Sequence, residues 1–300
     1  MDTYPNLFSP HAGRDDSRPL RAMTSSRLEL DSALKPDGEA AFTAELSPDW
    51  CIAHTPNGGY LMSVVLRAMG RVLPFPDPVT ATAHYCVPAE TGPATVKVEV
   101  IRTGRTLARG VGRLLQHDVE RLRVVAAFGR LPEVPQPLLY GDDRPFVIAS
   151  LERCRKFELG TPDGGSASVR SRFDTYYDPS SVGWASDRPT REPQLKAWVR
   201  SEDGSQADRY SLPVMIDALP STAFELGVTG WVPTIELTIH QRAVPAPGWL
   251  KCGFRGRQAG NGLFDEDGEV WDSAGHLVAI SRQLAALPET FATDSHKAKA

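Results

Sequence analysis

The chain lacks the features that mark three large classes of protein. It has no excess of positive charge, because 33 lysine and arginine residues stand against 37 aspartate and glutamate residues and the formal net charge is -4. Binding of nucleic acid through a broad basic surface is therefore not expected. No segment approaches the roughly 20 apolar residues of a membrane span, and the stretch from Met1 to Met23 has no apolar core of signal-peptide length. We expect a cytoplasmic protein that binds neither nucleic acid nor membrane.

Closely spaced cysteines are also missing. The four cysteines, Cys51, Cys86, Cys154 and Cys252, stand singly along the chain, without the spacings that zinc sites and thiol redox motifs use. No glycine-rich phosphate-binding loop links a strand to a helix. We expect buried, reduced thiols, no metal site and no cofactor.

Apolar residues and turn-forming residues are both plentiful. Hydrophobic residues make up 41% of the chain, which also holds 25 glycines and 25 prolines. The hydrophobic content is typical of a globular protein, because a disordered chain could not bury enough apolar surface to offset its ordering entropy. The glycine and proline content favours many turns and sheet edges over a helical bundle.

The first half predicts a hairpin, a buried helix and an antiparallel meander. Residues 27–34 and 39–46 alternate roughly and flank Lys35-Pro36-Asp37-Gly38, which is typical of a hairpin turn. From Gly58 to a point before Pro74, apolar residues occupy nearly every side of a predicted helix, so other structure must surround it. Valine-rich, alternating strands are expected at residues 79–86, 94–102, 107–115 and 121–131.

The second half repeats this order. Strand-like runs at 172–179 and 194–203 precede a helix at 212–226, which Pro220 should interrupt or bound. Strands are expected at 234–242, 249–256, 262–271 and 276–287. An internal duplication of roughly 120 to 140 residues accounts for the repetition. The expected parts are a flexible segment (1–25), a first unit (26–133), a proline-rich linker (134–149), a second unit (150–288) and a flexible tail (289–300).

A buried helix enclosed by a curved antiparallel sheet, present twice, resembles two fused hot-dog units. From about Arg27 to Leu287, the sequence is similar to the acyl-CoA thioesterase II (TesB-like) double hot-dog family. The order of elements carries this resemblance, through these motifs: Gly58-Gly59-Tyr60, His84-Tyr85-Cys86-Val87-Pro88, Arg102-Thr103-Gly104-Arg105, Asp217, Thr234-Ile235-Glu236 and Gln283. The fold implied is an α+β double hot-dog whose two halves join in one continuous sheet, with further homo-oligomerisation plausible.

The resemblance also implies an activity. The expected reaction is the hydrolysis of an acyl-CoA or acyl-carrier-protein thioester by activated water, without a covalent acyl-enzyme. Asp217 would orient or deprotonate the water, and Thr234 and Gln283 would hold the water and the carboxylate. Backbone N–H groups at the start of the first helix, from Gly58, Gly59 and Tyr60, would bind the thioester carbonyl, with Gly59 and Tyr60 favoured.

Two other functions stay open from the sequence. Asp49 and His54 lie five residues apart before the first helix, as an aspartate and a histidine do in hot-dog enoyl hydratases, which would use such a pair for acid–base addition of water. The residues between them do not include the Asn-Pro that such hydratases usually have. The third possibility is a non-catalytic acyl-binding module, because a fold does not determine a function.

Overall fold

The computed structural model describes residues 25–132, 141, 144–157 and 168–288. Residues 1–24, the tail at 289–300 and most of the expected linker lie outside the described residues, so the proposed unit boundaries stay predictions. Within the described part, no helix is long and apolar enough to cross a membrane.

Twelve strands form one antiparallel sheet, in the order β1-β2-β6-β7-β8-β5-β11-β14-β13-β12-β10-β9. The first-half strands are β1 (Leu34–Pro36), β2 (Ala41–Leu46), β5 (Asp77–Tyr85), β6 (Gly92–Thr103), β7 (Ala108–Gln116) and β8 (Val119–Gly129). The second-half strands are β9 (Phe173–Tyr177), β10 (Gln194–Ser201), β11 (Thr234–Gln241), β12 (Leu250–Gly260), β13 (Leu263–Trp271) and β14 (Leu277–Ala286). Two short strands, β3 (Cys51–Ile52) and β4 (Thr55–Pro56), pair separately.

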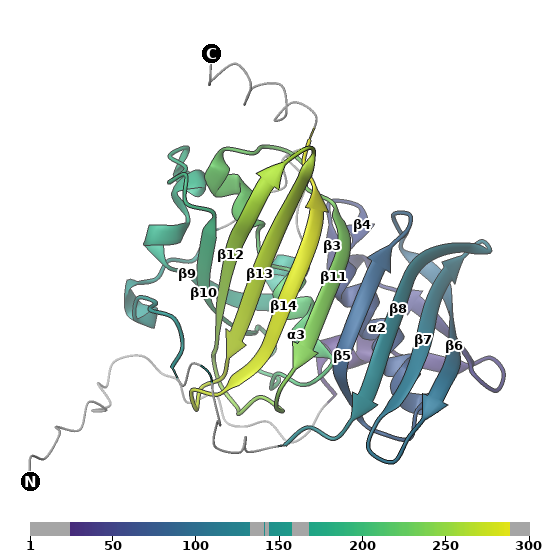
Figure 1. Ribbon diagram of the computed structural model, residues 1–300. Helices are drawn as coiled ribbons and strands as arrows, with labels where there is room; N and C mark the ends of the chain where they lie inside the picture. Colours follow the sequence, from purple (N-terminus) through teal and green to yellow (C-terminus); the bar gives the residue numbers. More distant parts are fainter. Residues whose placement is uncertain (1–24, 133–140, 142–143, 158–167, 289–300) are drawn as a thin grey trace, which may run out of the picture.

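The sheet order confirms the expected internal repeat. Outward from the centre, the first half runs β5-β8-β7-β6-β2-β1 and the second runs β11-β14-β13-β12-β10-β9, so each strand has a counterpart in the same position. The halves meet where β5 pairs with β11, with Thr82 opposite Thr238, and these two hydroxyls are 2.8 Å apart. The halves therefore form one continuous sheet, as the double hot-dog architecture requires (Figure 1).

The first-half helix, α2 (Gly58–Val72), is enclosed by other structure as expected. Asn57 caps it, because its Oδ1 accepts a hydrogen bond from the Tyr60 N–H at 3.0 Å. Ten of its fifteen residues are buried, and eight of these ten belong to a hydrophobic core that includes residues of both halves. The helix packs on the same side of the sheet as α3 (Figure 1).

The second-half helix is shorter than its counterpart. Helix α3 (Ser211–Asp217) has seven residues, and Pro220 separates it from a 3-10 turn at Thr222–Leu226. The predicted interruption at Pro220 is thus confirmed. Helices α2 and α3 meet closely at Gly59, where an added Cβ would lie 2.2 Å from the Pro213 carbonyl oxygen. This close approach places the end of α3 beside the start of α2.

Two expectations are wrong in detail. The run after Ser26 begins with a helical turn, α1 (Arg27–Asp31), because the Ser26 hydroxyl accepts from the Glu29 N–H and caps it. Only β1 and β2 form the predicted hairpin. The cysteines are all free, but Cys86 is exposed whereas the other three are buried.

We expect Gly59→Ala to destabilise the protein by about 1–3 kcal/mol, because the new methyl group would overlap the Pro213 carbonyl and separate the two helices. Denaturant unfolding would measure the change. Gly260→Ala is the matched control, since nothing lies within 4 Å of its Cβ position. Equal free energies of unfolding for the two variants would contradict the close contact of α2 with α3.

Candidate active site

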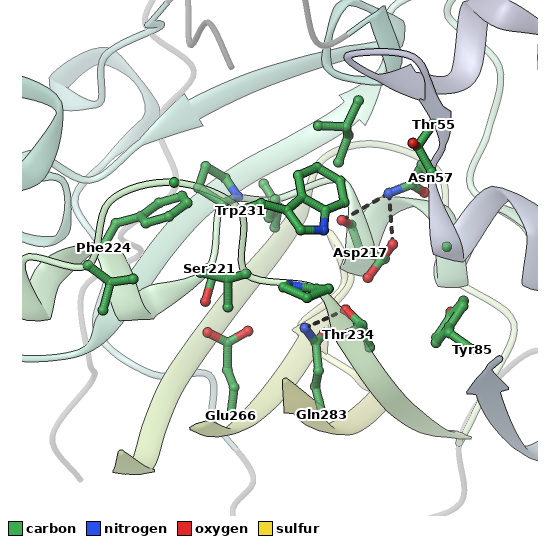
Figure 2. Close-up of a pocket in the computed structure, with 18 of the residues that line it drawn as sticks. Thr55, Asn57, Tyr85, Asp217, Ser221, Phe224, Trp231, Thr234, Glu266 and Gln283 are labelled. Carbon is green, nitrogen blue, oxygen red and sulfur yellow. Dashed lines mark hydrogen bonds between the residues drawn. The ribbon is translucent and has the colours of Figure 1, made fainter. Parts of the chain in front are cut away.

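A cavity of about 840 Å³ is lined by residues of both halves. Most of its wall is apolar, including Ile52, Leu61, Ile216, Leu219, Phe224, Trp231 and Phe254. Its polar groups include Asn57, Tyr85, Asp217, Thr234, Glu266 and Gln283 (Figure 2). A largely apolar cavity with a few convergent polar groups is the usual form of a small-molecule site.

Asp217, the last residue of α3, faces the first turn of α2. Its Oδ2 accepts hydrogen bonds from Asn57 Nδ2 at 2.7 Å and from the Gly59 N–H at 2.9 Å. Asn57 Nδ2 also donates to the Asp217 backbone carbonyl at 3.2 Å (Figure 2). A carboxylate has about four acceptor positions, so Asp217 can bind a further donor, such as water, from the cavity that it lines.

Burial raises the pKa of Asp217 to about 6. The donors from Gly59, Asn57 and Gly58 act in the opposite direction, because they stabilise the charged form, but they do not cancel the cost of removing the carboxylate from water. A carboxyl group with this pKa is largely ionised at neutral pH and can still accept a proton from water. These are the properties that a general base requires.

Thr234 and Gln283 form a hydrogen-bonded pair in the same cavity. Gln283 Nε2 donates to Thr234 Oγ1 at 2.8 Å, and both side chains are half-buried. They come from the neighbouring strands β11 and β14. The structure thus brings all three predicted catalytic residues to one cavity, although no hydrogen bond joins Asp217 to the pair in the described structure (Figure 2).

Glu266 on β13 is a cavity residue that the sequence did not single out. Its Oε2 accepts from the Thr222 N–H at 2.8 Å and from the Thr222 hydroxyl at 2.5 Å. Its backbone lies opposite Gln283 in the sheet register. Burial raises the pKa of Glu266 to about 7, and Asp217 contributes in the same direction.

A sequence signal for Glu266 does exist. Along β13, Glu266 occupies the same alternate positions as Phe264, Gly268 and Val270, all on the buried face. A carboxylate in a buried row is unusual, because charged groups are rarely buried without partners. Asn57 could have been found more easily, because it directly precedes the predicted helix, where an N-cap residue is expected.

The predicted carbonyl-binding N–H groups do not all face the cavity. The Gly59 N–H donates to Asp217 and the Tyr60 N–H donates to Asn57. The side chain of Tyr60 is fully buried, and its hydroxyl donates to the Asp31 carbonyl at 2.5 Å. Of the three residues, only Gly58 lines the cavity, and its N–H also lowers the pKa of Asp217. Gly59 and Tyr60 therefore have no free N–H to offer a thioester carbonyl.

The alternative pair, Asp49 and His54, does not form a site. Asp49 is bound in ion pairs by Arg27 at 2.9 Å and by Arg172 at 2.6 Å. His54 is exposed, and neither residue lines the cavity. The structure therefore gives no support to the hydratase alternative at these two residues. Among the described residues, no cluster of three or more histidine, cysteine, aspartate or glutamate side chains could hold a metal ion.

Comparison with known proteins identifies relatives of both halves. The model of the acyl-CoA thioesterase N-terminal domain matches residues 46–129, and that of the C-terminal domain matches residues 151–287. The thioesterase-like protein TwmA of Talaromyces wortmannii is 26% identical over 307 residues, covering 81% of this chain and 87% of TwmA.

Solved structures agree with these matches. A candidate thioesterase II from Thermobifida fusca YX is 31% identical, with a TM-score of 0.81, covering 89% of this chain and 100% of the other. A protein of unknown function with the hot-dog fold, from Alicyclobacillus acidocaldarius, is 18% identical, with a TM-score of 0.72, covering 88% and 99%. The second likeness concerns the fold alone. The chain therefore belongs to the acyl-CoA thioesterase family and is a thioester hydrolase with the double hot-dog fold.

Proposed function

We propose that Asp217 is the general base that activates water for attack on an acyl-CoA thioester. The observation that carries this proposal is a half-buried carboxylate at the cavity wall with a pKa raised to about 6. Asp217 takes a proton from the water while the water oxygen attacks the carbonyl carbon of the thioester. The carbon–sulfur bond then breaks, and the thiolate leaves with the proton that Asp217 returns. The products are the free acid and the thiol.

Thr234 and Gln283 hold the attacking water in this mechanism. The Gln283 amide has two N–H groups and a carbonyl oxygen, and the Thr234 hydroxyl both donates and accepts. One Gln283 N–H is used on Thr234, so the pair keeps donors and acceptors for a water in the cavity. Because the hydrogen bond already fixes both side chains, little further conformational entropy is lost when the substrate binds.

The acyl group occupies the apolar part of the cavity. Apolar side chains, among them Ile216, Leu219 and Phe254, make up most of this wall and suit a hydrocarbon chain. Coenzyme A is the carrier that we propose, because both matching family models describe acyl-CoA thioesterases. An acyl-carrier-protein thioester stays the alternative, and assaying both carriers with one acyl group would compare them.

We expect Asp217→Asn to lower kcat by about 10²- to 10⁴-fold. Asparagine has nearly the same shape and keeps an acceptor oxygen for the Gly59 N–H, but it cannot take a proton from water. Thiol release from acyl-CoA would measure kcat, and circular dichroism would check the fold. Asp37→Asn, at an exposed turn, is the matched control. Wild-type turnover by folded Asp217→Asn would remove Asp217 from the mechanism.

The pH dependence of the reaction should show which carboxyl group is the base. Asp217 is active when deprotonated. We therefore expect kcat/KM to reach its maximum at pH values well above the pKa of about 6 and to fall as the pH decreases through that pKa. In Glu266→Gln the acidic limb should stay near 6, because Asp217 still titrates. Loss of that limb in Glu266→Gln would instead make Glu266, with its pKa near 7, the group that controls turnover.

We expect Gln283→Ala to lower kcat by about 10- to 100-fold, because the attacking water loses a positioning group. The melting temperature should change little, since this side chain is only half-buried and its partner Thr234 borders the cavity. Thiol release and thermal unfolding would be measured together. Gln194→Ala, which removes an amide outside the cavity, serves as the control. A large fall in melting temperature that accounts for the lost activity would argue for a structural role.

A further inference from the structure

Tyr85, a residue of the cavity wall, carries a hydroxyl that has no hydrogen-bond partner among the described residues. The Tyr85 hydroxyl is shielded from solvent and makes no hydrogen bond with any described residue. Tyr85 ends β5 and lines the cavity (Figure 2). Buried polar groups are nearly always hydrogen-bonded in native proteins, so an orphaned hydroxyl at a binding site calls for an explanation. A bound substrate is one source of the missing partner.

The Tyr85 ring lies directly against the start of α2. A Cβ added to Gly58 would lie 2.7 Å from Tyr85 Cε1 and 2.9 Å from its hydroxyl oxygen. At the next residue, a Cβ added to Gly59 would lie 2.9 Å from Asp217 Cβ. The orphaned hydroxyl and the candidate base therefore contact successive residues of the same helical turn.

Hydrolysis of a thioester needs a hydrogen-bond donor at the carbonyl oxygen of the substrate. Negative charge develops on the carbonyl oxygen as water attacks, and a fixed donor aimed at that oxygen stabilises the transition state. The N–H groups of Gly59 and Tyr60 are already bound to Asp217 and Asn57, and that of Gly58 is turned toward the Asp217 carboxyl. The first turn of α2 is thus occupied in holding the base.

We infer that the Tyr85 hydroxyl donates a hydrogen bond to the thioester carbonyl oxygen and stabilises the oxyanion that forms there. This inference rests on the proposed function of Asp217. Water adds its oxygen to the carbonyl carbon, and its proton passes to Asp217. The carbonyl electron pair moves onto the oxygen that Tyr85 contacts. When that pair re-forms the double bond, the carbon–sulfur bond breaks and the thiol leaves. Tyr85 keeps its proton throughout.

The surroundings of Tyr85 suit a donor. Burial, with contributions from Asp217 and Glu236, raises the pKa of Tyr85 well above its usual range, so the hydroxyl stays protonated at any pH at which the protein works. No described residue accepts a hydrogen bond from this hydroxyl, so its hydrogen stays free for the substrate. A donor in such a water-excluded site is stronger than the same group in water.

Tyr85→Phe tests the inference. We expect kcat to fall about 10²-fold while KM changes little, because the contact strengthens in the transition state. The melting temperature should stay the same or rise, since the variant removes a buried polar group that has no partner in the free protein. Tyr176→Phe, outside the cavity, is the matched control. Wild-type kcat in folded Tyr85→Phe would overturn the inference and leave the thioesterase proposal intact.

The Gly58→Ala variant tests the contact of Tyr85 with the substrate in a second way. The new methyl group keeps the Tyr85 hydroxyl but displaces the end of its ring, because the ring atoms lie within 2.9 Å of the new carbon. We expect kcat to fall in this variant as well. A Gly58→Ala protein with wild-type kcat would show that the position of the hydroxyl does not matter.

A spectroscopic measurement separates this inference from the mechanism. Acyl-CoA with an isotopically labelled carbonyl would be bound to Asp217→Asn and to Asp217→Asn/Tyr85→Phe, and the infrared carbonyl band would be compared. Loss of the Tyr85 donor should move the band to higher frequency. The band reports the contact and not turnover, so it tests the contact separately from the rate. An unshifted band would overturn the contact with Tyr85.

Discussion

The contact between Asp217 and the first turn of α2 is the interaction on which the site depends. The carboxylate accepts from the Asn57 side chain and from the Gly59 backbone, which lie 160 and 158 residues earlier in the chain. Asn57 also caps α2 through the Tyr60 N–H. One set of hydrogen bonds thus starts a helix, joins the two halves and holds the candidate base. Gly59 permits this arrangement, because only a residue without a side chain lets α3 approach so closely.

The same contact sets the chemistry of the carboxylate. A negative charge at the end of a helix is unfavourable, whereas one at the start of another helix is favourable, and Asp217 occupies both positions. Burial then raises its pKa to about 6 against these donors. Glu266, in the same cavity, has a pKa raised to about 7, in part by Asp217. The charge of Asp217 therefore makes it harder for Glu266 to ionise in the same apolar cavity.

The fold is duplicated, but the site is divided between the halves. The first half contributes the start of α2, at Asn57, Gly58 and Gly59, and the buried hydroxyl of Tyr85. The second half contributes the carboxylates of Asp217 and Glu266, the hydroxyl of Thr234 and the amide of Gln283. Helix α3 has seven residues where α2 has fifteen. A helix that short is marginal alone, so its packing against α2 stabilises both its conformation and the placement of Asp217.

Local patterns in the sequence predicted the repeated order of strands, the buried helix after Gly58 and the break at Pro220, and the resemblance to the TesB-like family supplied three candidate residues that share one cavity. Alternation, helical periodicity and turn residues are local signals, so they can be read without coordinates. Which groups of the site are already paired became evident from the fold. It assigned the N–H groups of Gly59 and Tyr60 to partners inside the protein, brought Glu266 into the cavity and left the Tyr85 hydroxyl without a partner. Hydrogen bonding and burial at this site depend on packing between segments about 160 residues apart, and no local pattern specifies that packing.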